Sequence, residues 1–221
     1  MEKKIFSIAI DGPAGAGKST IAKKAAKVLG IEYIDTGAMY RALTLKVIRK
    51  NLNPENPSDI INLLDCTDID FIDNHIYLDG EQVDDDIREN IINKNVSYIA
   101  TIKEVRDYMV LLQKKMAQSK SLIMDGRDIT SVVLPNADFK FYVTASVEER
   151  GRRRYIELIN KGEEDITLEQ IISEIQNRDY IDSKRNISPL TQTEDSYLLD
   201  TTDKTIDECV NQIVSIVRGV K

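Results

Sequence analysis

The amino-acid sequence predicts an α/β protein built on a doubly wound parallel sheet. Short runs of β-branched and other apolar residues alternate with longer segments in which apolar residues recur at the spacing of a helix. Parallel strands need a crossover of a dozen or more residues, and a helix is the usual crossover. The 221 residues are enough to bury a sizeable core without disulfides. We therefore expect one domain over residues 1–221, with helices on both faces of its sheet.

The N-terminal part of the chain is expected to run strand, helix, strand, helix. Residues 5–10 (IFSIAI) are apolar, rich in β-branched residues and followed at once by a turn signal, which is typical of a buried strand. The apolar spacing then becomes helical until Gly30, the expected end of the first helix. Residues 32–35 form the second expected strand. Thr36 is expected to cap the second helix, which runs from about residue 38 to residue 50.

Residues from about 60 to 97 differ in pattern and are expected to be an insert in the α/β core. Short apolar pieces alternate between residues 68 and 83, and the pairs Asp73-Asn74 and Asp79-Gly80 separate them. Such pairs favour the tight turns of hairpins, so this stretch predicts a small antiparallel sheet. The insert is thus expected to combine antiparallel strands with helical flanks.

The α/β pattern resumes after the insert. Further strands are expected at residues 121–124, 139–143 and 197–199. A Ser or Thr followed three residues later by Glu or Gln is the capping-box signature of a helix start. Four helices are expected to begin at such pairs, which are Thr101 with Glu104, Ser146 with Glu149, Thr167 with Gln170, and Thr205 with Glu208.

One motif predicts the chemistry. Residues 12–19 match G-x-x-x-x-G-K-[ST], the P-loop, between an expected strand and an expected helix. Its glycines let consecutive backbone N–H groups surround phosphate oxygens, with the positive end of the helix behind them. Lys18 is expected to reach the outer phosphates, and Ser19 to ligate Mg²⁺ together with Asp125. The residues expected to bind the nucleotide are Gly12, Pro13, Ala14, Gly15, Ala16, Gly17, Lys18, Ser19 and Thr20.

Composition excludes several other classes of site and partner. The chain has 30 basic and 37 acidic residues, a net charge of −7, which argues against binding nucleic acid or an anionic membrane surface. One histidine and two cysteines without a metal-ligand spacing argue against a zinc site or a catalytic triad. No run approaches the roughly 18 apolar residues of a membrane span. With no leader-like N-terminus and no heptads, a cytoplasmic monomer is expected.

The segment Asp125-Gly126-Arg127-Asp128 favours a site for two phosphate groups over other P-loop classes. A GTPase would carry Asn-Lys-x-Asp, but this chain has Asn93-Lys94-Asn95-Val96 instead. An arginine two residues after a strand-end carboxylate is expected to hold a second phosphate. Thr36 and Arg41, at the start of a helix, form another candidate anion site, unless they are an ordinary cap and a surface arginine.

Four arginines follow Ser146 on the same expected helix. Arg150, Arg153 and Arg154 share one face of that helix, whereas Arg152 points away. The three fit a clamp on a transferring phosphoryl group, or alternatively a solvated basic face.

A later helix is expected to carry Arg178, Asp182 and Arg185 along one stripe, because their spacing is i, i+4, i+7. These side chains can serve a phosphate and a sugar hydroxyl. Alternatively, they can simply pair with one another.

Together these motifs resemble the bacterial cytidylate kinases, a family of nucleoside monophosphate kinases, over nearly the whole chain. The shared motifs are residues 8–13 (IAIDGP), 33–41 (YIDTGAMYR), 125–128 (DGRD) and 146–150 (SVEER), and Arg178-Asp179 with Asp182, Arg185 and residues 188–190 (SPL). The resemblance implies a P-loop kinase core that transfers a phosphoryl group from ATP with Mg²⁺ to CMP or dCMP. Residues 60–97 would then be the monophosphate-binding segment, and residues 150–165 a lid over ATP.

The resemblance also implies a role for each candidate residue. Thr36, Arg41, Arg127 and Arg185 would hold the phosphate of CMP. Ser97, Arg106 and Asp128 would read the cytosine, and Tyr40, Arg178 and Asp182 would lie along the sugar. Arg150, Arg153 and Arg154 would bind ATP from the lid, and Lys18, Arg127, Asp128 and Arg185 would serve catalysis. Asp128 can accept a hydrogen bond from the amino group of cytosine, which uracil lacks.

Two alternatives remain open from the sequence. The first is the same reaction on another acceptor, such as UMP, AMP or shikimate. The second is a regulator that binds nucleotide without catalysis and contacts RNA through residues 150–154. The acidic net charge and the second phosphate site disfavour the regulator.

Overall fold

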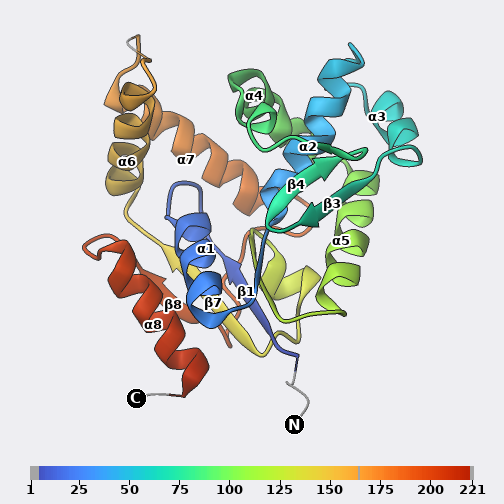
Figure 1. Cartoon of the computed structure of the whole chain (residues 1–221). Helices are drawn as coiled ribbons and strands as arrows, with labels where there is room; N and C mark the ends of the chain where they lie inside the picture. Colours follow the sequence, from blue (N-terminus) through green and yellow to red (C-terminus); the bar gives the residue numbers. More distant parts are fainter. Residues whose placement is uncertain (1–4, 164, 220–221) are drawn as a thin grey trace. The chain divides into compact units, whose positions relative to one another are not determined.

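The computed structural model describes residues 5–163 and 165–219. The chain divides into two compact units (Figure 1): unit 1 comprises residues 1–31 and 122–221, and unit 2 comprises residues 32–121. The predicted domain over residues 1–221 includes residues 1–4 and 220–221, and the predicted lid over residues 150–165 includes residue 164; these lie outside the described residues.

A parallel sheet forms the core of unit 1. Strand β1 (Ser7–Asp11) pairs with β6 (Leu122–Gly126) and with β7 (Phe139–Thr144), which in turn pairs with β8 (Tyr197–Asp200), all in parallel. Within the described residues the sheet has five strands, in the order β2-β6-β1-β7-β8; four of them belong to unit 1, and the edge strand β2 (Glu32–Asp35) is counted with unit 2. Neighbouring strands are distant in sequence, as in doubly wound sheets with crossover connections. The predicted fold class is confirmed.

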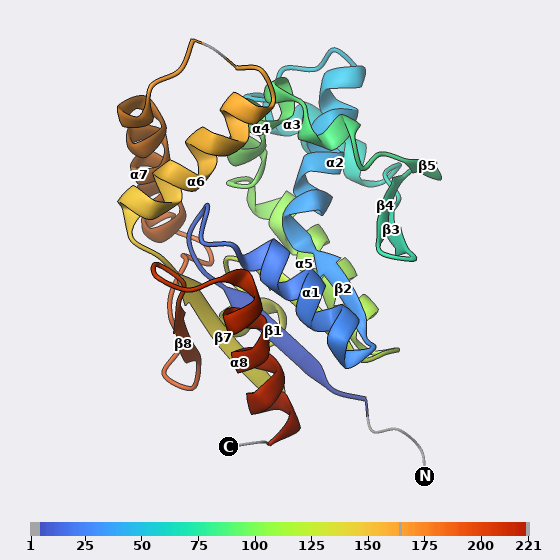
Figure 2. The ribbon, with the colours of Figure 1, turned by 60° about the vertical axis from the view of Figure 1, so that its left-hand side comes forward.

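Helices cover the sheet of unit 1. They are α1 (Lys18–Leu29), α6 (Val147–Asn160), α7 (Leu168–Lys184) and α8 (Ile206–Arg218), with a π-helical turn η2 at Ile129–Val133. Helix α1 packs against α8, and α6 packs against α7 (Figure 2). Leu158, Ile171 and Ile175 form an apolar cluster between α6 and α7. Gly30, in the left-handed conformation (φ 66°), ends α1 as predicted.

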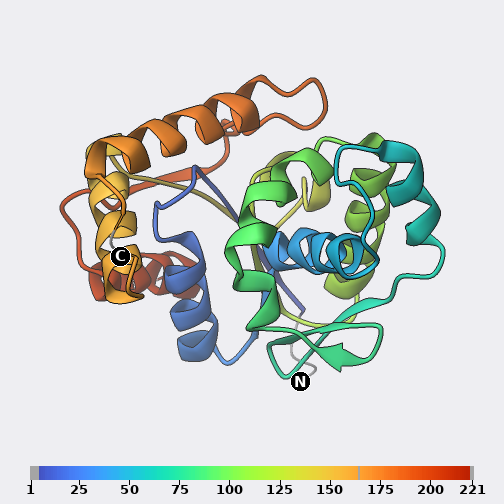
Figure 3. The same ribbon diagram turned by 90° about the horizontal axis from the view of Figure 1, so that it is seen from above.

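Unit 2 combines helices with a small antiparallel sheet. Its elements are α2 (Thr36–Arg49), α3 (Pro57–Leu64), β3 (Ile69–Ile72), β4 (His75–Leu78), β5 (Glu81–Gln82), the 3-10 turn η1 (Asp86–Arg88), α4 (Asn90–Ile99) and α5 (Lys103–Ala117). Helix α2 runs between the other elements and contacts α4, α5 and β4 (Figure 3). The predicted antiparallel strands are confirmed in the order β3-β4-β5. The predicted turn pairs 73–74 and 79–80 have φ between 51° and 84°, as tight turns require.

Two predicted helix caps are wrong. The cap of α2 is Asp35, whose carboxylate accepts a hydrogen bond from the N–H of Ala38 (2.9 Å), and Thr36 is a buried residue of the first turn. Helix α5 has no side-chain cap, because the hydroxyl of Thr101 donates to the carbonyl oxygen of Tyr98 at the end of α4 (2.6 Å). At α2 a neighbouring residue therefore caps the helix in place of the predicted one, whereas at α5 the predicted hydroxyl binds elsewhere and no side chain caps the helix.

The remaining capping boxes are confirmed in part. The boxes at residues 167–170 and 205–208 form completely. At Ser146 only half of the box forms: its hydroxyl accepts from the N–H of Glu149 (3.2 Å), whereas the carboxylate of Glu149 pairs with two arginines of its own helix. Among the described residues, none of the helices could span a membrane.

Candidate active site

Residues 12–17 form the loop between β1 and α1 that the sequence predicted as a P-loop. Gly12 has to lack a side chain, because a Cβ there would lie 1.9 Å from the carbonyl oxygen of Val143 in β7. Gly17, at φ 85°, precedes α1 in the left-handed conformation that glycine adopts readily. The loop therefore packs directly on the sheet and leads into a helix N-terminus, where an anion is favoured.

Lys18 is buried at the start of α1, and its Nζ donates to the carbonyl oxygen of Pro13 within the loop (2.7 Å). The pKa of Lys18 is lowered to about 7. Burial is the main cause, and the positive charges of Arg127 and Arg178 add to it, against a smaller opposite effect of nearby carboxylates. The loop thus holds a cation whose charge is only partly compensated, and an anionic ligand would complete the compensation.

Ser19 and Asp125 join α1 to the C-terminal end of β6. The Oγ of Ser19 donates to Oδ2 of Asp125 (2.9 Å), and Asp125 is 3 % exposed. A hydroxyl and a carboxylate are oxygen ligands of the kind Mg²⁺ prefers, and Mg²⁺ usually completes its shell with water and phosphate. The described part of the chain holds no group of three or more His, Cys, Asp or Glu side chains suited to a metal. The Ser19–Asp125 pair therefore fits Mg²⁺ that arrives with nucleotide phosphates.

Unit 1 also carries a cluster of charged side chains, which we call the arginine–carboxylate cluster: Arg127, Asp128, Asp182 and Arg185. The Nε of Arg127 donates to Oδ2 of Asp182 (2.8 Å). Arg185 lies 3.8 Å from both Asp128 and Asp182. Burial alone would raise the pKa of Asp182, but the surrounding arginines, Arg127 first, outweigh it and lower that pKa. The fold thus brings together four residues that two separate sequence motifs predicted to be in the active site.

Arg185 reaches this cluster from outside α7, so the predicted stripe of three residues on one helix is wrong. The helix ends at Lys184, and the backbone of Arg185 is extended (φ −61°, ψ 143°). The Nε of Arg185 then donates to the carbonyl oxygen of Ser188 (2.5 Å). The turn after the helix, rather than helical periodicity, therefore positions this guanidinium, while Arg178 and Asp182 lie on α7 as expected.

Asp11, at the end of β1, is a residue of this region that the sequence analysis did not single out. Its fully buried carboxylate accepts hydrogen bonds from the N–H of Ile129 (2.9 Å), the N–H of Thr130 (2.7 Å) and the hydroxyl of Thr130 (2.6 Å). Burial raises the pKa of Asp11 although these hydrogen bonds oppose the shift. Because η2 begins directly after Asp128, the bonds fix the backbone that carries Asp128. In the sequence, the signal that could have pointed to Asp11 is a carboxylate at the end of an otherwise apolar strand.

Arg150 is built into the wall of the P-loop. It is 4 % exposed, and its Nη1 donates to the carbonyl oxygen of Ala14 (3.0 Å) and to Oδ2 of Asp179 (2.5 Å). Oδ1 of Asp179 accepts from the N–H of the same Ala14 (3.3 Å). Side chains from α6 and α7 therefore bind the carbonyl oxygen and the N–H of Ala14 in the P-loop. Asp179, like Asp11, was not assigned to the site from the sequence.

The other arginines of α6 differ in their surroundings. Arg153 donates from Nη1 to Oγ1 of Thr201 (3.0 Å), beside the P-loop. Arg154 pairs with Glu157 of its own helix (2.8 Å). Arg152 has the most exposed side chain of the four, at 57 %, as expected of a residue that points away from the others.

Unit 2 carries the remaining predicted residues, which are Thr36, Tyr40 and Arg41 on α2, Ser97 on α4 and Arg106 on α5. Arg41 donates from Nη2 to Asp35 (3.0 Å), whereas its buried Nε has no hydrogen-bond partner among the described residues. The guanidinium of Arg106, 3 % exposed, lies 5.9 Å from the centre of the Tyr40 ring. Ser97 is half-buried. Unit 2 thus offers a buried guanidinium N–H that an anion would satisfy.

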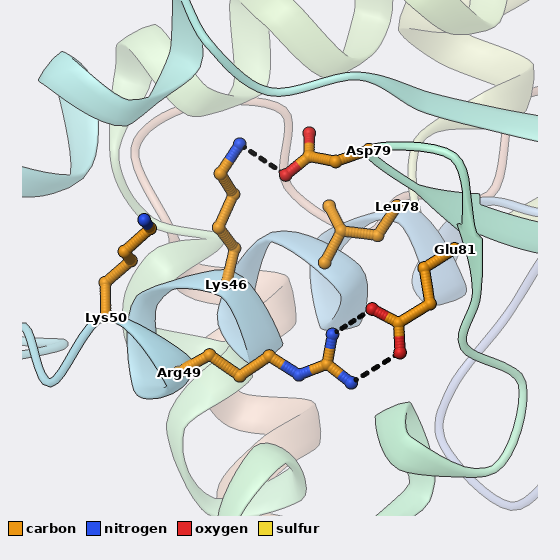
Figure 4. A pocket seen from close by; sticks show the side chains of 6 residues that line it. All are labelled: Lys46, Arg49, Lys50, Leu78, Asp79 and Glu81. Atoms are coloured by element: carbon orange, nitrogen blue, oxygen red, sulfur yellow. Dashed lines mark hydrogen bonds and ion pairs between the residues drawn. The ribbon is translucent and has the colours of Figure 1, made fainter.

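A pocket of unit 2 beside α2 and β4 contains none of the predicted residues (Figure 4). Its lining is Lys46, Arg49, Lys50, Leu78, Asp79 and Glu81. Lys46 pairs with Asp79 (2.7 Å), and Arg49 pairs with Glu81 (2.7 Å), as the dashed lines show. Two of its three cations are thus already paired with its two carboxylates, so the lining is not a strong anion site.

A P-loop with a buried lysine, a Ser–Asp pair beside it and a second group of arginines define the class of P-loop phosphotransferases. Comparison with protein families narrows this class, because the family described as cytidylate kinase matches residues 8–219. The chain belongs to the cytidylate kinase family.

Individual relatives agree with this assignment. The cytidylate kinase of Caldanaerobacter subterraneus subsp. tengcongensis is 53 % identical over 211 residues, which cover 96 % of this chain and 94 % of that one. The cytidylate kinase of Clostridioides difficile strain 630 is 53 % identical over 208 residues, which cover 94 % of this chain and 96 % of that one. Among solved structures, a shikimate kinase from Bacteroides thetaiotaomicron matches with a TM-score of 0.50 and 12 % identity. The match covers 97 % of this chain and 99 % of that one. This last likeness shows the fold alone.

Proposed function

We propose that this protein transfers the γ-phosphoryl group of ATP to CMP and dCMP, giving ADP and CDP or dCDP. An oxygen of the acceptor phosphate bonds to the γ-phosphorus, and the bond from that phosphorus to the β,γ-bridging oxygen breaks. Membership of the cytidylate kinase family supports the choice of acceptor. The observation that carries the proposal is the arginine–carboxylate cluster in the same unit as the P-loop, because it supplies cations for a second phosphate.

On the donor side, we propose that residues 12–20 hold ATP and that Lys18 leaves the carbonyl oxygen of Pro13 for the phosphates. Ser19 and Asp125 would hold Mg²⁺, which neutralises charge on the phosphate oxygens. No side chain has to act as a strong base, because a loose transition state places its charge on the phosphoryl oxygens. Arg150, Arg153 and Arg154 are proposed to support the donor from a lid at residues 150–165.

The proposed roles in binding the acceptor CMP follow the pattern of the cytidylate kinase family. Thr36, Arg41, Arg127 and Arg185 would bind its phosphate, Ser97, Arg106 and Asp128 its base, and Tyr40, Arg178 and Asp182 its sugar. The partnerless buried Nε of Arg41 supports an anion there. The carboxylate of Asp128, 6 % exposed, would accept from the amino group of cytosine, and residues 60–97 would be part of the monophosphate-binding segment.

The cellular setting is proposed on composition. A net charge of −7 favours small-molecule substrates over nucleic acid or an anionic membrane. Cys66 is exposed and Cys209 is buried, and both are free thiols, as is usual in a reducing compartment. We propose a cytoplasmic enzyme that acts as a monomer.

Acceptor choice tests this function most directly. With ATP and Mg²⁺, we expect ADP to form rapidly with CMP and dCMP, and kcat/KM to be about 10²-fold lower with UMP. The reason is that uracil presents a carbonyl oxygen where cytosine presents its amino group, so an acceptor rather than a donor would face the buried carboxylate of Asp128. A coupled assay of ADP release across CMP, dCMP, UMP, AMP and shikimate measures this. A clear preference for AMP or shikimate would refute the proposal, and ATP hydrolysis that no acceptor stimulates would favour the regulator.

The pH dependence of ATP binding is expected to follow Lys18. ATP phosphates favour the charged ammonium, so binding raises a pKa that is about 7 in the free protein, and a proton is taken up. The affinity is therefore expected to fall as pH rises above about 7, by up to about tenfold per unit. Calorimetric titration from pH 6 to pH 9 measures the slope. The Lys18→Met variant is the control, since the nucleotide's own titration appears equally in it; an identical slope in both proteins contradicts the prediction.

A further inference from the structure

Side chains hold three carbonyl oxygens of the P-loop. They are the oxygens of Pro13, bound by Nζ of Lys18 (2.7 Å), of Ala14, bound by Nη1 of Arg150 (3.0 Å), and of Ala16, bound by Oγ1 of Thr201 (3.1 Å). Thr201 follows β8, is 185 residues from Ala16 along the chain and is 1 % exposed. It belongs to no motif of the sequence and has no role in the function proposed above. A fully buried hydroxyl against the P-loop therefore needs its own explanation.

Arg153 fixes the direction of the Thr201 hydroxyl. The Nη1 of Arg153 lies 3.0 Å from Oγ1 of Thr201, and its Nη2 lies 2.6 Å from the carbonyl oxygen of the same residue. A guanidinium can only donate, so the hydroxyl oxygen accepts from Arg153 and its own proton is directed to Ala16. Oε1 of Glu149 accepts from the Nε of Arg153 (2.8 Å), which holds the guanidinium in place. The hydroxyl is thus an oriented donor to the P-loop.

A fixed carbonyl oxygen at Ala16 also fixes the N–H of Gly17. The peptide bond is planar and trans, so its carbonyl oxygen and its N–H point in opposite directions. With the oxygen of Ala16 turned toward Thr201, the N–H of Gly17 is turned to the opposite side. Gly17 sits at φ 85° and has no side chain to restrict rotation of this peptide. The hydrogen bond from Thr201 supplies a restraint on this peptide from outside the loop.

We propose that Thr201 is a positioning residue for ATP, which keeps the Ala16–Gly17 peptide turned so that the N–H of Gly17 faces the phosphates. Arg153 acts on the nucleotide through Thr201 by orienting its hydroxyl. This inference rests on the proposed function only in taking ATP as the ligand of the P-loop. Because Thr201 acts on the donor phosphates, its loss affects ATP binding and leaves acceptor binding unchanged.

Two variants at this position separate the hydroxyl from the shape of the side chain. Thr201→Val keeps the shape and removes the hydroxyl, and we expect its dissociation constant for ATP with Mg²⁺ to rise about tenfold, as for one lost buried hydrogen bond. Thr201→Ser keeps the hydroxyl, and we expect binding within about twofold of the wild type. Calorimetric titration without acceptor measures both. In steady state, the KM for ATP is expected to rise in Thr201→Val while the KM for the acceptor stays constant.

Thr202→Val is the matched control. The hydroxyl of Thr202 donates to Oδ1 of Asp200 (2.6 Å) and accepts from the N–H of Ser146 (3.0 Å), so this variant disturbs the same segment without touching the P-loop. Wild-type affinity in Thr201→Val, an equal loss in Thr202→Val, or a failure of Thr201→Ser to restore binding would each overturn the proposal. If Thr201→Val does not fold, Thr201→Ala removes the same hydroxyl. The titration contains no acceptor, so failure of CMP in the acceptor assay leaves it interpretable.

Discussion

Replacement of Lys18 by alanine is expected to lower kcat about 10³-fold, within the range for removing a cation that stabilises a transferring phosphoryl group. Lys18 is buried at the start of α1, and its ammonium already lies within the P-loop, 2.7 Å from the carbonyl oxygen of Pro13. In the proposed mechanism, negative charge that develops on the phosphoryl oxygens would then lose a compensating cation. Steady-state kinetics of ADP formation at saturating ATP and CMP measure the effect.

The same variant is expected to stay folded. The pKa of Lys18 is lower in the folded protein, about 7, than its ordinary value of 10.5, so this lysine opposes folding in full at pH below about 7, and the effect fades as pH rises toward 10.5. The temperature of unfolding of Lys18→Ala at pH 6 should therefore not be below that of the wild type. Lys23→Ala, at an exposed position of the same helix, is the control and should leave kcat unchanged. Turnover of Lys18→Ala within tenfold of the wild type would remove Lys18 from the mechanism.

Replacement of Arg127 by alanine is expected to lower kcat/KM by about 10² to 10³-fold, the size found when one preorganised donor to a developing charge is removed. Arg127 follows β6 and its Nε donates to Asp182 (2.8 Å), which keeps the guanidinium in the arginine–carboxylate cluster. We expect Arg127→Lys to recover only part of the activity, because an ammonium lacks the planar fork that binds two phosphate oxygens at once. Kinetics with CMP as acceptor measure both variants.

A second substitution separates the chemical role of Arg127 from its structural role. Without Arg127 the carboxylate of Asp182 stays largely buried with a weaker partner, Arg185 at 3.8 Å, so Arg127→Ala is expected to unfold at a lower temperature. The double variant Arg127→Ala/Asp182→Asn removes that charge and should recover stability but not turnover. Recovered turnover in the double variant would show that Arg127 only stabilises the fold. Arg152→Ala, at an exposed arginine of α6, should match the wild type.

Elements set by local interactions could be predicted from the sequence. Gly30 ends α1, the turn pairs at 73–74 and 79–80 shape the small sheet, and the boxes at 167–170 and 205–208 start their helices. Each of these depends on residues at most a few positions apart, whose preferred conformations do not need the rest of the chain.

Predictions failed where a second partner competed for the same group. Asp35 rather than Thr36 caps α2, because its carboxylate reaches the N–H of Ala38. The hydroxyl of Thr101 is used at the end of the preceding helix. Arg185 leaves the helical stripe since α7 ends one residue earlier. A sequence pattern shows which partners are possible, and only the packed chain shows which one is used.

The sequence alone predicts the P-loop, with Lys18 and Ser19, and the second set of arginines, because these residues stand in short motifs whose spacing carries the chemistry. Only the tertiary structure revealed what holds them. The carboxylate of Asp11 binds Thr130 across 119 residues, Asp179 binds Ala14 across 165, and Thr201 binds Ala16 across 185. No local preference encodes such contacts. They form because burial of the sheet removes water from these polar groups, which then have to find partners within the protein.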